Sequence, residues 1–160
     1  VVEINVDKDI PKYDQFGPLK GLEYQKNLER LAFTSGGRTQ SAPAQRLVDF
    51  VDGKISQNLN DSSYQPGLNS APMHSLLPRL IGNRLRKGFD AFGKKMHGYY
   101  TNEANIVGVE SRTSSPVNIP RKDNLEHPEI KGLFPCGEGA GYAGGIISAA
   151  IDGVKCAEQC

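Results

Sequence analysis

The sequence has 160 residues, of which 38% are hydrophobic and 23% charged, as is ordinary for a folded globular protein. The formal net charge is +1, so no overall charge favours binding to nucleic acid or to an anionic membrane surface. No run of roughly 18 apolar residues occurs, which excludes a membrane-spanning helix of the usual kind. The length suits one domain, or a piece of a larger one.

The N-terminal part is predicted to contain one strand and one helix. Residues 1–6 alternate apolar and polar side chains, which predicts a strand. A polar turn region with two prolines follows at residues 9–18. A helix is expected from about Leu19 to Ser35, because apolar residues recur on one face and two glycines follow it. The chain begins Val1-Val2 without an initiator Met or a signal-peptide pattern, so we expect a fragment or a processed chain.

A second helix is predicted from the residues that begin and end it. Ser41 can act as its N-cap, Pro43 suits the first turn, and Gly53 can end it. Residues 54–72 are rich in Asn, Ser, Gly and Pro and show no periodicity. So long a segment is expected either to be a functional loop or to lie against another part of the protein.

The clearest helix is predicted from about Ser75 to Met96. Its apolar residues recur at spacings of three and four: Leu77, Ile81, Leu85, Phe89, Phe92 and Met96. Basic residues occupy the other side: Arg79, Arg86, Lys87 and Lys94. We interpret this basic side as a solvated face, and the alternative is a surface that attracts an anionic ligand or partner.

The C-terminal part is predicted to combine short strands with a last helix. Strands are expected at 104–109, 117–119 and 133–136, a charged loop at 123–131 and a helix at about 145–159. The sequence therefore predicts a mixed α and β fold (α+β), with a largely helical region at 1–103 and a strand, glycine turn and helix within 104–160. No linker separates two independent domains.

The cysteines indicate neither a disulfide framework nor a metal site. There are three, Cys136, Cys156 and Cys160, with no Cys-x-x-Cys spacing and no paired histidines nearby. We expect reduced thiols, no metal and a cytoplasmic protein.

A glycine-rich run, Gly-Glu-Gly-Ala-Gly-Tyr-Ala-Gly-Gly at 137–145, is the most informative segment. It follows a predicted strand and opens a predicted helix, whose first N–H groups favour anionic atoms. Gly139, Gly141 and Gly144 fit the dinucleotide pattern G-x-G-x-x-G. Only 16 residues follow Gly144, too few for the second strand and the acidic residue of an ADP-binding unit. The turn is therefore expected to serve another part of a cofactor site, or only tight packing.

The run from Gly132 to Gly153 closely resembles the C-terminal flavin-binding segment of a family of bacterial FAD-dependent dehydrogenases, flavoproteins with two dinucleotide-binding folds. Residues 17–25, 42–50 and 108–117 resemble other segments of that family. The resemblance covers nearly the whole chain. It implies the C-terminal part of an oxidoreductase that transfers a hydride between a small-molecule substrate and FAD.

The resemblance also implies how such a protein is divided. Residues 1–103 would belong to an inserted substrate or cap region, and residues 104–160 would complete the FAD-binding domain. The strand, glycine turn and helix that bind the ADP half of FAD are absent from these 160 residues. The expected partners are therefore the remainder of the polypeptide and a small-molecule substrate, and this fragment alone is expected to bind FAD weakly or not at all and to be inactive.

Specific roles follow from the resemblance. Glu138 would contact the ribityl chain or the nearby phosphates, and the backbone N–H groups of residues 139–145 would approach the pyrimidine edge of the flavin ring. Tyr142 would either line the flavin or close the start of the helix. The implied cofactor contacts are Gly137, Glu138, Gly139, Ala140, Gly141, Tyr142, Gly144, Gly145 and Ile146.

Residues 110–115 combine an acid, a cation and four hydroxyls. Arg112 is the candidate anchor for a carboxylate substrate, since its planar group can form two parallel hydrogen bonds. The segment could equally be a hydrogen-bonded turn. No catalytic acid or base can be identified. Two other hypotheses remain: a non-enzymatic helical interaction module whose glycine turn is only structural, and a site for a different phosphate ligand.

Overall fold

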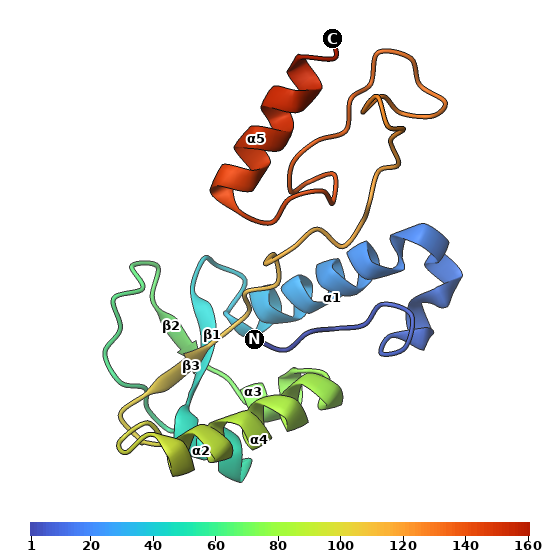
Figure 1. Cartoon of the computed structure of the whole chain (residues 1–160). Coiled ribbons are helices and arrows are strands. Elements are labelled where there is room, and N and C mark those ends of the chain that lie inside the picture. Colours follow the sequence, from blue (N-terminus) through green and yellow to red (C-terminus); the bar gives the residue numbers. More distant parts are fainter. The chain divides into compact units, whose positions relative to one another are not determined.

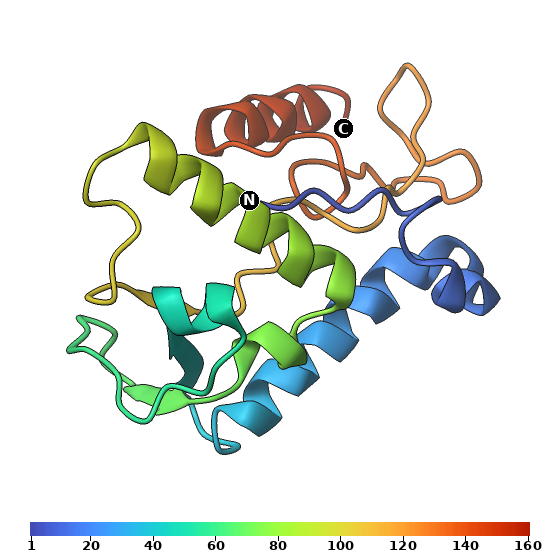
Figure 2. The same ribbon diagram turned by 90° about the horizontal axis from the view of Figure 1, so that it is seen from below.

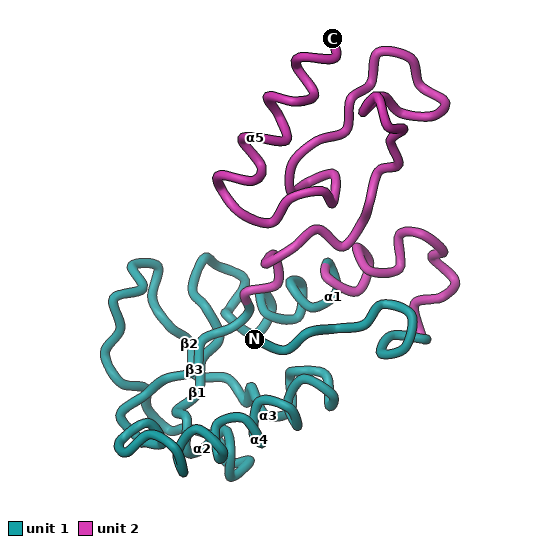
Figure 3. The backbone as a smooth tube through the Cα atoms, viewed as in Figure 1, with its two compact units in different colours: residues 1–11, 26–109 teal, residues 12–25, 110–160 magenta.

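A computed structural model describes all residues from 1 to 160, and the fold is mixed α and β, as predicted (Figure 1). The chain forms two compact units (Figure 3). Unit 1 consists of residues 1–11 and 26–109, and unit 2 of residues 12–25 and 110–160. The predicted division after residue 103 stays a prediction.

Unit 1 contains a small mixed sheet with strand β1 (Ala42–Arg46) at its centre. Strand β2 (Leu68–Ser70) pairs with β1 in parallel, and Ala42 lies opposite Leu68. Strand β3 (Asn105–Val107) lies within the predicted strand at 104–109 and pairs with β1 on the other side in antiparallel fashion.

The predicted helix beginning at Ser41 is wrong in its first half. Residues 42–46 form β1, and helix α2 (Leu47–Asp52) begins only afterwards. Strands on both sides satisfy the backbone of β1; even the carbonyl oxygen of Pro43 accepts the N–H of Gly108 at 3.0 Å. These tertiary hydrogen bonds outweigh the local preference of a Ser-x-Pro start. Gly53 ends α2 in the left-handed conformation (φ 72°), as predicted.

The predicted helix over 75–96 is divided in two. Helix α3 (Met73–Leu76) stops before Pro78, and helix α4 (Arg79–Lys95) begins after it. Leu77 is extended (ψ 141°), because a residue that precedes proline avoids the helical region. The apolar periodicity continues through Pro78, but the helix does not.

The core of unit 1 lies where its helices meet. Its central residues are Leu28, Phe50, Met73 and Leu77. Leu28 comes from helix α1 (Lys20–Ser35), which matches the predicted helix at 19–35. Helices α2 and α3 both contact β1, and α4 contacts α2 and α3 (Figure 2). The rings of Phe50 and Phe89 meet edge to face at 6.0 Å, a favourable aromatic arrangement.

The predicted strand at residues 1–6 is also wrong. These residues have no strand partner, and a turn follows them. The segment is held instead by α4, since Arg84 donates to the carbonyl oxygen of Glu3 at 2.7 Å. The region predicted as a polar turn contains a short 3-10 helix, Pro11–Leu19, interrupted at Gly17.

Unit 2 is built mainly from irregular backbone and one long helix, α5 (Ile146–Ala157), close to the predicted helix at 145–159. The predicted strands at 117–119 and 133–136 are irregular. Ala140 and Cys156 are its buried hydrophobic residues. No helix of the chain is long and apolar enough to cross a membrane.

Candidate functional site: the glycine-rich turn before helix α5

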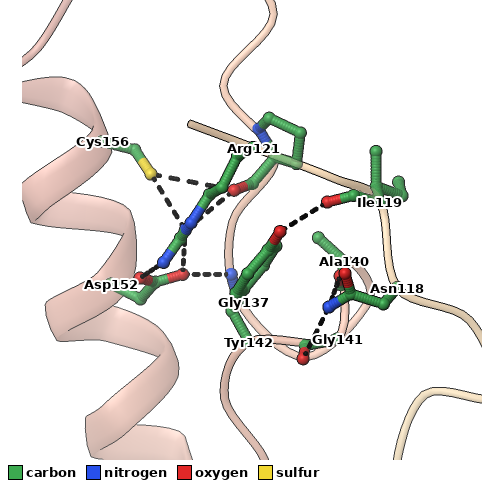
Figure 4. A network of polar contacts seen from close by, with 10 residues as sticks. Asn118, Ile119, Arg121, Gly137, Ala140, Gly141, Tyr142, Asp152 and Cys156 are labelled. Carbon is green, nitrogen blue, oxygen red and sulfur yellow. Dashed lines mark hydrogen bonds and ion pairs between the residues drawn. The ribbon is translucent and has the colours of Figure 1, made fainter. Parts of the chain in front are cut away.

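The first part of the glycine-rich run folds into a tight turn (Figure 4), and the run ends at Gly145, directly before α5. The N–H of Gly141 donates to the carbonyl oxygen of Glu138 at 2.9 Å, and that of Tyr142 donates to Gly137 at 3.1 Å. Gly137 and Gly141 have φ values of 71° and 84°, which L-residues with a side chain rarely adopt. Their positive φ values therefore explain why Gly137 and Gly141 are glycines.

Gly141 also has a packing reason. A Cβ atom there would lie 2.7 Å from the carbonyl oxygen of Val117, far inside normal contact. The neighbouring residues 118 and 119 hold the turn through hydrogen bonds, from Asn118 Nδ2 to the carbonyl oxygen of Gly141 (3.2 Å) and from the Ile119 N–H to that of Ala140 (3.1 Å). At Gly141 the structural explanation of the glycine is sufficient.

Gly139 and Gly144 differ from Gly141. No atom lies within 4 Å of where their Cβ atoms would be, and neither glycine has a positive φ. Both are exposed and both come shortly before α5. Neither conformation nor packing within the chain explains why these positions lack side chains.

The start of α5 leaves backbone donors at the same end of the turn. Gly145 is the N-cap residue, and its N–H donates to the Ser148 hydroxyl at 3.1 Å. The first N–H groups of any α-helix have no partner within the helix, and the helix dipole makes this end positive. The arrangement can therefore accept anionic atoms.

A polar network ties the turn to α5 (Figure 4). Two nitrogens of Arg121 donate to the two carboxylate oxygens of Asp152, at 2.8 and 2.9 Å. Asp152 also accepts the N–H of Gly137 at 2.8 Å. The Arg121 guanidinium carbon lies 3.7 Å from the centroid of the Tyr142 ring, a cation–π contact.

The contact between Arg121 and Asp152 shifts the pKa values of both side chains. The hydrogen bonds from Arg121 and then from the Gly137 N–H lower the pKa of Asp152 below its usual 3.8. The same pairing raises the pKa of Arg121, so the pair stays ionised at neutral pH. Arg121 and Asp152 were not predicted from the sequence, because a cation and an acid 31 residues apart carry no pairing signal.

The predicted cofactor contacts differ in accessibility. Glu138 is exposed, and its carboxylate makes no hydrogen bond or ion pair within the chain. Ile146 is 92% exposed, whereas Ala140 is buried. The Tyr142 hydroxyl donates to the carbonyl oxygen of Ile119 at 2.8 Å, so Tyr142 helps to close the turn. The contact of each of these residues with a flavin stays a prediction.

The segment containing Arg112 is a local turn next to the glycine-rich turn. The Arg112 N–H donates to the Glu110 carboxylate at 2.9 Å, and the Arg112 residue is exposed. Ser115 makes the contact with the glycine-rich turn, since its hydroxyl lies 3.2 Å from the carbonyl oxygen of Gly139. The role of Arg112 as a substrate anchor stays a prediction.

Comparison with known proteins gives the chain a family. An uncharacterized protein from Clostridium beijerinckii is 43% identical over 144 residues, which is 89% of this chain and 27% of that protein. The chain thus spans about a quarter of the length of this relative. The sequence model for "FAD-dependent protein, C-terminal domain-like" matches residues 1–113, most of the chain but not the glycine-rich turn. The chain therefore belongs to the family of FAD-dependent proteins as a C-terminal domain-like region.

Proposed function

We propose that this chain is part of an FAD-dependent oxidoreductase, a dehydrogenase, and that the glycine-rich turn with the start of α5 contacts the flavin. The observation that supports this most directly is the unexplained pair Gly139 and Gly144. Both leave backbone uncovered in the segment that precedes α5, in a chain that belongs to an FAD-dependent family. Backbone without side chains allows a flat ring to come close.

Each part of the turn has a distinct role in this proposal. The N–H groups at the start of α5 stabilise negative charge on the cofactor without any rearrangement of side chains. Glu138, exposed and unpaired, accepts hydrogen bonds from hydroxyls of the ribityl chain. When bound, FAD would supply the redox chemistry, the acceptance of a hydride from the substrate. The Arg121–Asp152 pair holds the turn on α5 and makes no direct contact in this proposal.

The test uses glycine-to-alanine substitutions in the longer native polypeptide. Gly139→Ala and Gly144→Ala add a methyl group where the chain itself has free space. We expect FAD affinity to fall roughly tenfold, about 1.4 kcal/mol, measured by titration of the flavin-free protein with FAD. Gly88→Ala in α4 is the matched control, because its Cβ would also meet nothing within 4 Å.

The same titration checks Glu138. Glu138→Ala is expected to weaken retention of FAD while the protein stays folded. Unchanged FAD affinity in both glycine variants would contradict the proposed contact. A native longer protein that carries no flavin and binds none would overturn the oxidoreductase proposal altogether.

A second role of the chain concerns the exposed apolar face of α5. Four large residues of this helix are strongly exposed: Ile146 (92%), Ile147 (73%), Ile151 (51%) and Val154 (58%). Since the chain spans 27% of the length of its relative, we propose that another part of the same polypeptide covers this face. The alternative hypothesis of a non-enzymatic interaction module also requires an exposed apolar surface of this kind.

The substitution Ile147→Asn tests whether the apolar face of α5 is covered in the longer polypeptide. In the 160-residue chain alone, we expect the free energy of unfolding to change by less than about 0.5 kcal/mol, because the site is exposed. In the longer polypeptide we expect a loss of about 2 kcal/mol, since an apolar side chain would be replaced in a buried contact. Lys155→Gln, at an exposed position of α5, is the control. Equal small effects in both proteins would contradict the proposal.

A further inference from the structure

Two of the three cysteines lie at the entrance of the glycine-rich turn, beside the C-terminal part of α5. Cys136 is exposed and directly precedes the turn, whereas Cys156 is buried on α5. The two cysteines are 20 residues apart in the sequence, so their proximity cannot be predicted from it. Contacts of the residues on either side of Cys136 bring Cys136 close to Cys156.

Both neighbours of Cys136 are fixed to side chains that face the turn from α5. The carbonyl oxygen of Pro135 lies 3.9 Å from Cys156 Sγ and accepts a hydrogen bond from Arg121 at 2.9 Å. On the other side, the Gly137 N–H donates to Asp152 at 2.8 Å. Asp152 and Cys156 are one helical turn apart and therefore share a face of α5. Residue 136 is thus held over the surface from which the Cys156 thiol projects.

The two thiols are close enough to influence each other. Burial is the main cause that raises the pKa of the Cys156 thiol, and the Cys136 thiol raises it further. Arg121 acts in the opposite direction, with a guanidinium nitrogen 3.6 Å from Cys156 Sγ. The pair therefore consists of an accessible thiol and a shielded thiol beside a fixed positive charge.

We propose that Cys136 and Cys156 form an oxidisable dithiol site that closes to an intramolecular disulfide when a peroxide is present. In the first step, the Cys136 thiolate attacks one oxygen of hydrogen peroxide. The O–O bond breaks, and a sulfenic acid and water result once the leaving hydroxide takes up a proton. In the second step, the Cys156 sulfur attacks the Cys136 sulfur, the S–O bond breaks, and a second water leaves. Two thiols and one peroxide thereby give one disulfide and two waters.

The third cysteine provides the control. The Cys160 thiol lies 3.4 Å from the carbonyl oxygen of Cys156, a backbone atom. Cys160 is exposed, so Cys160→Ser should leave the fold unchanged. The bond formed between 136 and 156 would fasten the entrance of the turn to α5, next to the contact that Asp152 already makes.

Trypsin digestion places Cys136 and Cys156 in different peptides. It cuts after Lys131 and Lys155, which places Cys136 in the peptide 132–155 and Cys156 in the peptide that begins at residue 156. The native polypeptide with Cys160→Ser is treated with hydrogen peroxide, blocked with a thiol reagent, digested without reduction and measured by mass spectrometry. We expect these two peptides joined by a disulfide, with loss of both thiols and full recovery of the thiols by dithiothreitol.

One further variant makes the result specific. Cys136→Ser, at an exposed position, should remove the linked peptide completely. Linked peptide that forms only when Cys160 is present would overturn the proposal, as would oxidation of Cys136 to sulfinic acid without any link. A disulfide found only between two chains, which a non-reducing gel detects as a dimer, would also overturn it.

Discussion

Arg121 and Asp152 form a two-pronged ion pair, with nitrogen–oxygen distances of 2.8 and 2.9 Å, across 31 residues of sequence. Both side chains are only 13% exposed, so the pair is shielded from much of the solvent. Asp152 also holds Gly137, the first residue of the glycine-rich turn. A single carboxylate therefore joins α5, the turn and the segment containing Arg121.

Asp152→Asn should destabilise this unit without changing the size of the side chain. It removes the negative charge and leaves Arg121 shielded without its partner, at a cost of about 2 kcal/mol in the free energy of unfolding. Urea unfolding followed by circular dichroism measures this change. Asp123→Asn, in the exposed loop, is the control and should change stability by less than about 0.5 kcal/mol. Equal effects of the two substitutions would contradict the role of the pair.

The same pair predicts a loss of stability in acid. Pairing lowers the pKa of Asp152 in the folded state below 3.8, its value in an unfolded chain. The carboxylate therefore contributes full stability above about pH 3.8, and this contribution is lost as the pH falls through the lower folded pKa. We expect the difference between wild type and Asp152→Asn to shrink as the pH is lowered from 5 in urea titrations. A constant difference across this range would contradict the assignment.

His74 predicts a separate dependence near neutral pH. Its Nδ1 lies 2.9 Å from the amide nitrogen of Gln45, which is completely buried, so neutral His74 can accept a hydrogen bond there. Burial, and next the charge of Arg86, lower the pKa of His74 below 6.5. The unfolded chain therefore takes up a proton first as the pH falls. The free energy of unfolding should decrease below pH 6.5, until the folded-state pKa is passed.

Two histidine variants separate this effect from general acid instability. His74→Gln should remove the pH dependence between about pH 5 and 7, whereas His97→Gln, at an exposed position, should keep it. Thermal unfolding at several pH values is the measurement. A dependence that persists in His74→Gln would show that another group is responsible.

The glycines of the turn should respond differently to alanine. Gly141→Ala requires a side chain at φ 84° and a Cβ atom 2.7 Å from the Val117 carbonyl oxygen, so we expect a loss of at least about 2 kcal/mol. Gly139→Ala has free space and should change stability by less than about 0.5 kcal/mol. The melting temperatures of the two variants provide the comparison. Similar melting temperatures would contradict the packing around Gly141.

Some elements could be predicted because their signals are local. Helix α1 follows from apolar periodicity and the glycines after it, α5 follows the glycine-rich run that opens it, and Gly53 ends α2 as its position indicates. The break between α3 and α4 also has a local signal, Pro78, which the apolar periodicity around it obscured. In each case a few neighbouring residues determine the backbone.

Other elements depend on partners that the sequence does not reveal. Residues 42–46 become the central strand because β2 and β3 pair with them, although Ser41 and Pro43 resemble a helix start. Residues 1–6 have a strand-like alternation but no partner, and they stay irregular. Alternation alone cannot decide, because a strand is stable only when another strand satisfies its hydrogen bonds.

The same distinction between local signals and distant partners applies to the candidate site. The sequence alone determined the glycine-rich turn, the helix that follows it and the resemblance to FAD-dependent proteins, because glycine patterns act through the local backbone. Only the tertiary structure decided that Gly141 has a packing role while Gly139 and Gly144 do not, and that Asp152, Arg121 and Cys156 gather at the turn. The physical reason is that steric fit and charge pairing depend on distances between residues far apart in the chain, and folding alone sets those distances.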